Sequence, residues 1–208
     1  IEKKQKLNCE LENVNSQIRI YRVDEGGKIM ENMSFEELLK INCFSEDKEK
    51  QQKASELLEY RYGCEIHCQD MDKSVLFAHH ARGCTIVAAK ICKNVAIYQN
   101  VTIGSNMKYN KLNNEWENVG SPIIDENVII ADGAKVLGPI VIGKNTVIGA
   151  GAIITKDIPE NSIAYGVNQY KPKNPDYDLV FNKNMISGEE IVKINEQRVA
   201  EFDKMKEK

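Results

Sequence analysis

The sequence lacks several features that mark common classes of protein. Its 208 residues carry a formal net charge of −3 with a pI near 5.8, so it has no basic excess of the kind that binds nucleic acid. No apolar run approaches the roughly 18 residues that a membrane span needs. The segment IEKKQKLNCE has charges but no apolar h-region, so it does not read as a secretory signal peptide. These absences predict a cytoplasmic protein with no nucleic-acid partner and no membrane insertion.

Histidine is scarce, and the cysteines lack the spacing of a metal site. The three histidines are His67, His79 and His80, and the six cysteines are Cys9, Cys43, Cys64, Cys68, Cys84 and Cys92. Without a secretion signal, we expect these cysteines to be reduced thiols. The segment CEIHC has no second cysteine pair of the kind that completes a zinc site, so we expect no metal.

From Ile124 onward an aliphatic residue recurs every six positions, in the blocks IDENVI, IADGAK, VLGPIV, IGKNTV, IGAGAI and ITKDIP. A period of six fits neither a simple helix nor a simple strand. It fits a chain that coils through three short flat faces, each of which points one aliphatic side chain into the axis. The fifth residue of each block, for example Val128 or Ala134, is also small or aliphatic, which predicts a second inward position.

The same period continues upstream, so the predicted solenoid spans residues 64–166. Earlier blocks begin at Met71, Phe77, Ile91, Ile97 and Ile103. Two residues, Gly83 and Cys84, are read as an interruption of the repeat. A polar run over residues 105–121 is predicted to leave the solenoid as an excursion loop.

The segments that flank the solenoid carry no hexads. Residues 1–63 are predicted to form an α/β cap segment, with a hairpin that turns at Gly26. The SFEE sequence at Ser34–Glu37 is a capping box that opens a short helix, and a second helix is expected over residues 46–60. Residues 167–208 are predicted to form a C-terminal tail and helix. The expected fold class is therefore mainly β, with short helical segments before and after the solenoid.

The segments VAIYQNVTIG and IGKNTVIGAGAIITKDIPENS resemble the bacterial hexapeptide-repeat acyltransferases, in particular the serine O-acetyltransferases and their capsule- and envelope-sugar relatives. The resemblance covers residues 66–168. It implies a left-handed parallel β-helix, a homotrimer, and acetyl-CoA as the acyl donor for a small hydroxyl acceptor. A cell-envelope or capsule sugar is the main interpretation of that acceptor, and L-serine is the alternative. A trimeric scaffold without catalytic activity is a third interpretation.

Acyl transfer from a thioester to a hydroxyl needs a base, and the block FAHHARG offers His79 and His80. The resemblance places the family's catalytic histidine in such a block. Counting back from Ile91 without a gap selects His79, whereas a one-residue gap that aligns HARG with the family's HATG-like string selects His80. The ungapped count also stacks Gln99 directly above His79, where it would orient the imidazole or the acceptor.

Two positions depart from the serine enzymes. An aspartate precedes the family's histidine, and Ala78 stands in that place here, so another group must orient the imidazole. A second histidine in the family's excursion loop helps to hold the amino acid, and the matching residue here is Ser121. The excursion loop is polar and aromatic, which suits a sugar. The candidate acceptor-binding residues are Gln99, Trp116 and Ser121.

The family binds coenzyme A in a groove between neighbouring subunits. The resemblance implies that small residues contact the pantetheine arm and that basic side chains meet phosphate. The matching positions are Gly104, Ala150, Gly151, Lys156 and Lys171. Where the family usually has a proline and an alanine after the last coil, this chain has Asn168 and Gln169.

Overall fold

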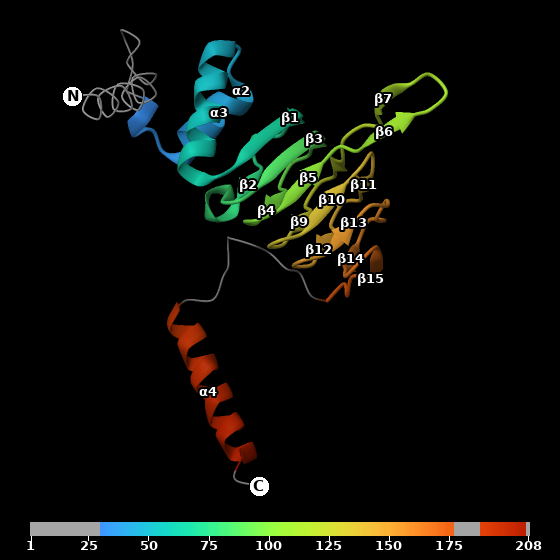
Figure 1. Cartoon of the computed structure of the whole chain (residues 1–208). Helices are drawn as coiled ribbons and strands as arrows, with labels where there is room; N and C mark the ends of the chain where they lie inside the picture. The colour runs from blue at the N-terminus through green and yellow to red at the C-terminus, as the bar shows by residue number, and fades with distance from the viewer. Residues whose placement is uncertain (1–29, 177–187, 207–208) are drawn as a thin grey trace, which may run out of the picture. The chain divides into compact units, whose positions relative to one another are not determined.

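A computed structural model describes residues 30–176 and 188–206 (Figure 1). The predicted hairpin at Gly26 lies outside these residues. The described helices are η2 (Met30–Asn32), α2 (Phe35–Phe44), α3 (Lys48–Tyr62), η3 (Ala78–Ala81) and α4 (Gly188–Lys206). The strands are β1 (Glu65–Met71), β2 (Leu76–Phe77), β3 (Thr85–Ile91), β4 (Ala96–Ile97), β5 (Thr102–Gly104), β6 (Met107–Asn110), β7 (Glu115–Asn118), β8 (Ile123–Ile124), β9 (Ile129–Ile130), β10 (Lys135–Leu137), β11 (Val141–Ile142), β12 (Val147–Ile148), β13 (Ile153–Ile154), β14 (Ser162–Tyr165) and β15 (Gln169–Pro172). The mainly-β class is confirmed.

The strands build a parallel solenoid with three faces. The β4 face consists of β2, β4, β9, β12 and β14. The β5 face consists of β5, β10 and β13, and the β8 face consists of β8 and β11. Strand β3 runs around the corner between these last two faces, because Ile86 pairs with Ile103 whereas Ile91 pairs with Ile124. Neighbouring coils pair in parallel, as the predicted β-helix requires, and the antiparallel β15 follows the last coil.

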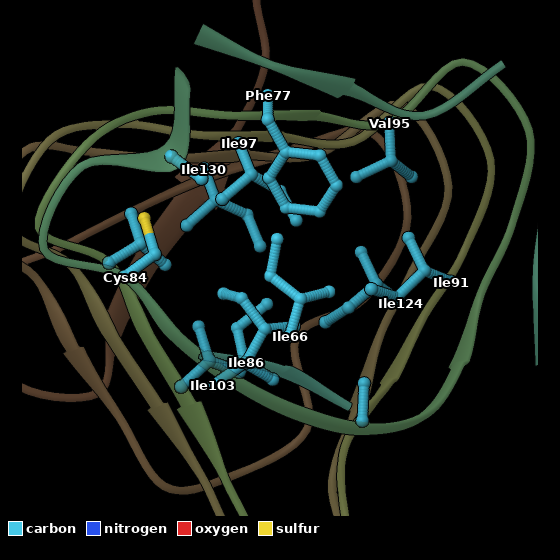
Figure 2. Packing of buried hydrophobic residues seen from close by; sticks show 14 of the residues in the cluster. Ile66, Phe77, Cys84, Ile86, Ile91, Val95, Ile97, Ile103, Ile124 and Ile130 are labelled. Carbon is cyan, nitrogen blue, oxygen red and sulfur yellow. The ribbon is translucent and has the colours of Figure 1, made fainter. Parts of the chain in front are cut away.

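The first residues of the hexads line the solenoid axis, and Figure 2 shows several of them converging there. Those from Ile86 to Ile154 are at most 1% exposed. The fifth positions are buried as well: Val95, Val101, Val128, Ala134, Ile140, Thr146, Ala152 and Ile158. Each buried Ile or Val contributes about 1.5–3 kcal/mol to stability. Because one coil cannot bury its own inner face, this contribution requires the whole stack.

Helix α2 begins at the predicted capping box. The Ser34 hydroxyl accepts from the Glu37 amide at 3.2 Å, and the Ser34 amide donates to Glu37 Oε2 at 2.9 Å. Helix α3 begins and ends two residues later than expected. Asp47 caps its start, and Gly63 ends it in the left-handed region with φ 63°.

Helices α2 and α3 cover the first-coil end of the solenoid. Their buried side chains Phe35, Leu38, Leu57 and Leu58 belong to the same core cluster as Ile66 of β1. The solenoid axis is therefore closed at this end by apolar helix faces. Helix α4 is part of a separate unit of the chain and confirms the predicted C-terminal helix.

The corner between the β8 face and the β4 face carries a ladder of asparagines. Asn94, Asn127, Asn145 and Asn161 all have φ between 55° and 58°. The Nδ2 atom of each of the first three donates to Oδ1 of the asparagine in the next coil, at 3.0–3.1 Å. Asparagine suits this place because it adopts the left-handed conformation more readily than most residues and supplies both a donor and an acceptor.

We expect Asn145→Asp to destabilise the protein by about 0.5–1.5 kcal/mol, because it replaces the donor to Asn161 with a second acceptor. Chemical denaturation of the purified chain measures the change. Asn118→Asp is the matched control, because Asn118 lies on the exposed hairpin and its oxygen accepts from the Gly120 amide, which aspartate also does. Equal losses in the two variants would mean that the ladder adds nothing to stability.

Candidate functional site

Both candidate histidines lie at the first-coil corner between the β4 face and the β5 face, called here the histidine corner. Phe77 and Ile86 flank this corner and are nine positions apart. Their partners in the next coil, Ile97 and Ile103, are only six positions apart. The first coil therefore contains three extra residues at this corner.

The extra residues form a left-handed backbone turn. His79, His80 and Ala81 have φ values of 53°, 57° and 51°. Each non-glycine residue in this conformation costs roughly 1–2 kcal/mol, and such strain concentrates at functional sites. Two hydrogen bonds close the turn: Arg82 N donates to His79 O at 3.4 Å, and Cys84 N donates to Ala81 O at 3.0 Å. Both histidine side chains are exposed on the turn.

The insertion changes which residues stack above this turn. Asn100 N donates to Arg82 O at 2.8 Å, and a Cβ on Gly83 would lie 3.7 Å from the Asn100 Cα. Gly83 therefore stacks beneath Asn100, and Arg82 stacks beneath Gln99. The expectation that Gln99 lies directly above His79 is wrong, because the count assigned the insertion to Gly83 and its neighbour.

The two imidazoles have different neighbours. The His80 ring lies 5.4 Å from the ring of Phe35 in α2 and 5.5 Å from the ring of Tyr62 in α3. The His79 ring lies 6.4 Å from the ring of Tyr98. The sequence did not reveal the aromatic neighbours of His80, because they come from helices far away in the chain. The ungapped count fails at this corner, so it no longer separates the two histidines, which differ in their aromatic neighbours.

Gln99 lies one coil above the histidines. Its Oε1 is buried and has no hydrogen-bond partner within the described part of the chain. A buried unpaired oxygen costs about 1–3 kcal/mol, so this atom is suited to accept from a ligand. Asp132 and Ala150 lie above Gln99 in the same column, since Gly133 N donates to Gln99 O and Gly151 N donates to Asp132 O.

A second group of predicted residues lies at the other end of the β5 face, called here the hairpin corner. The excursion forms the β6–β7 hairpin, in which Tyr109 pairs with Trp116 and their exposed rings lie 5.3 Å apart. Gly104 precedes the hairpin and Ser121 follows it. Lys156 lies at the same corner on a later coil, directly after β13.

The predicted site residues are thus divided between two corners of the chain. The histidine corner holds His79, His80, Gln99, Ala150 and Gly151. The hairpin corner holds Gly104, Trp116, Ser121 and Lys156. Lys171 lies at neither corner, because it is on β15 and pairs with Ile163. The β5 face separates the two groups, so one chain does not bring them together.

Asn168 stands where the family usually has proline. Its side chain bonds to Thr155 at the end of the solenoid. Its Nδ2 donates to Thr155 Oγ1 at 2.8 Å, and its Oδ1 accepts from Thr155 N at 2.7 Å. Its φ of 53° again suits asparagine. This departure from the family pattern therefore has a structural explanation.

Within residues 30–176 and 188–206, no group of three or more His, Cys, Asp or Glu side chains could hold a metal ion. No helix in these ranges is long and apolar enough to cross a membrane.

Burial raises the pKa of Cys43 and of Cys64 to about 12, so both thiols stay protonated near neutral pH.

Comparison with known proteins agrees with this geometry. A family model described as bacterial transferase hexapeptide (six repeats) matches residues 121–156. The serine acetyltransferase of Bacillus pumilus is 34% identical over 116 residues, which are 54% of this chain and 49% of that protein. The serine acetyltransferase of Mycobacterium tuberculosis is 36% identical over 116 residues, which are 55% of this chain and 47% of that protein. Residues 121–156 therefore match the hexapeptide-repeat family, and about half of this chain is similar to serine acetyltransferases.

A solved structure titled as a serine acetyltransferase in complex with cysteine has the same fold. Its TM-score to this chain is 0.54 at 24% identity, and the match covers 74% of this chain and 56% of that one. The hexapeptide-repeat match begins after the hairpin, so His79 and His80 lie outside it. The chain spans about half the length of these two curated relatives.

Proposed function

We propose that the chain is an acetyl-CoA-dependent O-acetyltransferase that works as a homotrimer, with His80 as the general base. The observation behind this proposal is the division of the candidate residues between the histidine corner and the hairpin corner. The histidine corner lacks the acceptor and donor candidates Trp116, Ser121, Gly104 and Lys156, and the hairpin corner lacks a base. A neighbouring copy supplies the missing half when its hairpin corner lies against the histidine corner.

The outward side chains of the three faces favour such an assembly. The outward residues of the β4 face pair in register and are all aliphatic: Leu76, Ala96, Ile129, Val147 and Ile163. The β8 face exposes Ile123 at 38% and Val141 at 43%. The β5 face presents Thr85, Thr102, Lys135 and Ile153 in one column and is the more polar. Two of the three faces are therefore suited to burial against a neighbour.

Cyclic packing of these two faces unites the corners. If the β4 face of each copy packs on the β8 face of the next, three copies close around a threefold axis. The asparagine ladder then points to the axis, and the β5 face points to solvent. The histidine corner of one copy then lies beside the hairpin corner of the next.

At this junction the acetyl group passes directly from the thioester to the acceptor hydroxyl. His80 takes the proton of the acceptor hydroxyl as its oxygen attacks the thioester carbonyl carbon. The carbon–sulfur bond then breaks, and the departing thiolate takes the proton back from the imidazolium, so charge and protons balance. Backbone amides of the corner residues are suited to stabilise the oxyanion.

L-serine is the first acceptor to test, because the relatives described above are named serine acetyltransferases. A sugar is the second candidate. The specific observation for it is the exposed Tyr109–Trp116 pair, whose faces offer a stacking surface on the hairpin that precedes Ser121. Rates of thiol release from acetyl-CoA with L-serine and with a panel of sugars decide between these acceptors.

The assembly is tested by its mass in solution. Light scattering of the wild-type chain should return three times the 23.6 kDa chain mass. Ile129→Glu should give a monomer, because it places a charge on the β4 face. Ile153→Glu is the matched control on the β5 face and should leave the trimer intact. A wild-type monomer would remove the junction between the corners and the proposal with it.

Donor binding is tested without any acceptor. Coenzyme A at a hundred times its dissociation constant should raise the free energy of unfolding by about 2.7 kcal/mol. The expected result is a higher melting temperature for the trimer. A trimer that shows no shift at millimolar coenzyme A would instead favour the non-catalytic scaffold.

A further inference from the structure

A groove of about 1010 Å³ opens beside the first coil, between α3, β1 and the base of the hairpin. Lys48, Gln51 and Ser55 line it from α3, and His67 lines it from β1. Ser121 lies at its far end, but the two histidines of the histidine corner do not line it. The groove therefore extends well beyond the residues assigned to acetyl transfer.

Helix α3 turns a polar stripe toward this groove. Its apolar side, with Leu57 and Leu58, is buried in the core. Its groove side presents Lys48, Gln51, Gln52 and Ser55, spaced i, i+3, i+4 and i+7, so all four share one helix face. A helix face at this spacing that looks toward the protein is usually apolar. Here it is rich in hydrogen-bonding groups.

The charged lining of the groove has one sign. Among the described residues Lys48 lines it, and no aspartate or glutamate does. This selection is notable in a chain with 31 acidic and 28 basic residues. Two thiols in the wall, Cys43 and Cys68, add no negative charge, since burial raises the pKa of each.

We infer that the groove binds a small organic or inorganic anion, with Lys48 meeting its charge and with the His67 ring and the Ser55 hydroxyl bonding its oxygens. Lys48 is already directed along the helix face, because its Nζ donates to Gln51 Oε1 at 3.0 Å. His67 follows the inward-pointing Ile66, so it points away from the axis and into the groove. This site does not depend on acetyl transfer.

The experiment is proton NMR of the histidine side chains in the full chain. With only three histidines, single His→Gln variants assign every imidazole resonance. Inorganic phosphate and citrate are the probes, titrated separately at constant ionic strength, with glucose as the neutral control. The expected result is a saturable shift of the His67 resonances with an anion and none with glucose.

The variants decide whether the groove is responsible. Lys48→Gln should weaken binding by at least about fivefold, because it removes a charged hydrogen-bond donor. Lys50→Gln is the matched control, since Lys50 is on the same helix but pairs with Asp47 outside the groove. An immobile His67 resonance with both anions overturns the inference. Equal anion affinity in the Lys48→Gln variant and in the wild-type chain also overturns it. Because the readout is binding, loss of acetyl transfer would not affect the result.

Discussion

His80→Asn should lower the rate of acetyl transfer by about 10²–10⁴-fold, which is the usual contribution of a general base. Asparagine is the best probe, because it tolerates the left-handed backbone at this position but cannot take the acceptor's proton. Trimer mass and coenzyme A binding should stay unchanged, since both depend on other residues. Steady-state thiol release, measured with the better acceptor, gives the rate.

His79→Asn is the matched control for this experiment, because the two histidines share the same turn and nearly the same φ. We expect it to retain most of the activity. If His79→Asn abolished turnover while His80→Asn did not, the aromatic rings of α2 and α3 would not mark the base. If neither substitution lowered the rate of acetyl transfer, the acceptor would not be activated at this corner, and the result would favour the scaffold interpretation.

The hexads predicted the solenoid well because each hexad corresponds to one face of a coil. An aliphatic residue every six positions requires three equal faces a turn, and every such residue from Ile124 to Ile154 is fully buried. The Ser34 capping box was equally readable, since its two hydrogen bonds join residues only three apart. Local patterns of this kind need no knowledge of distant contacts.

The histidine corner could not be placed in the same way. Phe77 and Ile97 differ by twenty positions instead of eighteen, so the sequence shows a net insertion of two residues. In the structure this is an insertion of three before Ile86 and a shortening by one between Ile86 and Ile91, where β3 turns the corner as one strand. Only strand pairing separates these two changes.

The sequence predicted which residues belong to the candidate site but not where they lie relative to one another. Family matching assigns residues to roles without saying which copy contributes each of them. The solenoid geometry shows that Ser121 and His80 lie at opposite ends of the β5 face. The aromatic contacts of His80 and the groove beside α3 both involve residues before the first coil. Neither could be read from the hexads, because those helices follow no repeat.

The largest effect on stability is expected for Ile154→Asp. Ile154 is 0% exposed and pairs with Val136 within the axis of the solenoid. The variant loses about 1.5–3 kcal/mol of apolar burial and adds the cost of a carboxyl group without a hydrogen-bond partner. The total is at least about 5 kcal/mol, which approaches the whole stability of a typical domain. We expect the chain to lose its cooperative unfolding transition in circular dichroism.

Ile153→Asp is the control that makes this result specific, because it changes the same residue type on the same strand. Ile153 is 41% exposed, points outward from the β5 face and pairs with Lys135, whose charge suits a carboxylate. Its cost should be below about 1 kcal/mol, the range of β-propensity differences on an exposed face. If the two variants unfolded at the same denaturant concentration, alternation across β13 would not decide burial, and the hexad register would be wrong at that coil. If Ile153→Asp alone unfolded the chain, the inward and outward positions would be exchanged.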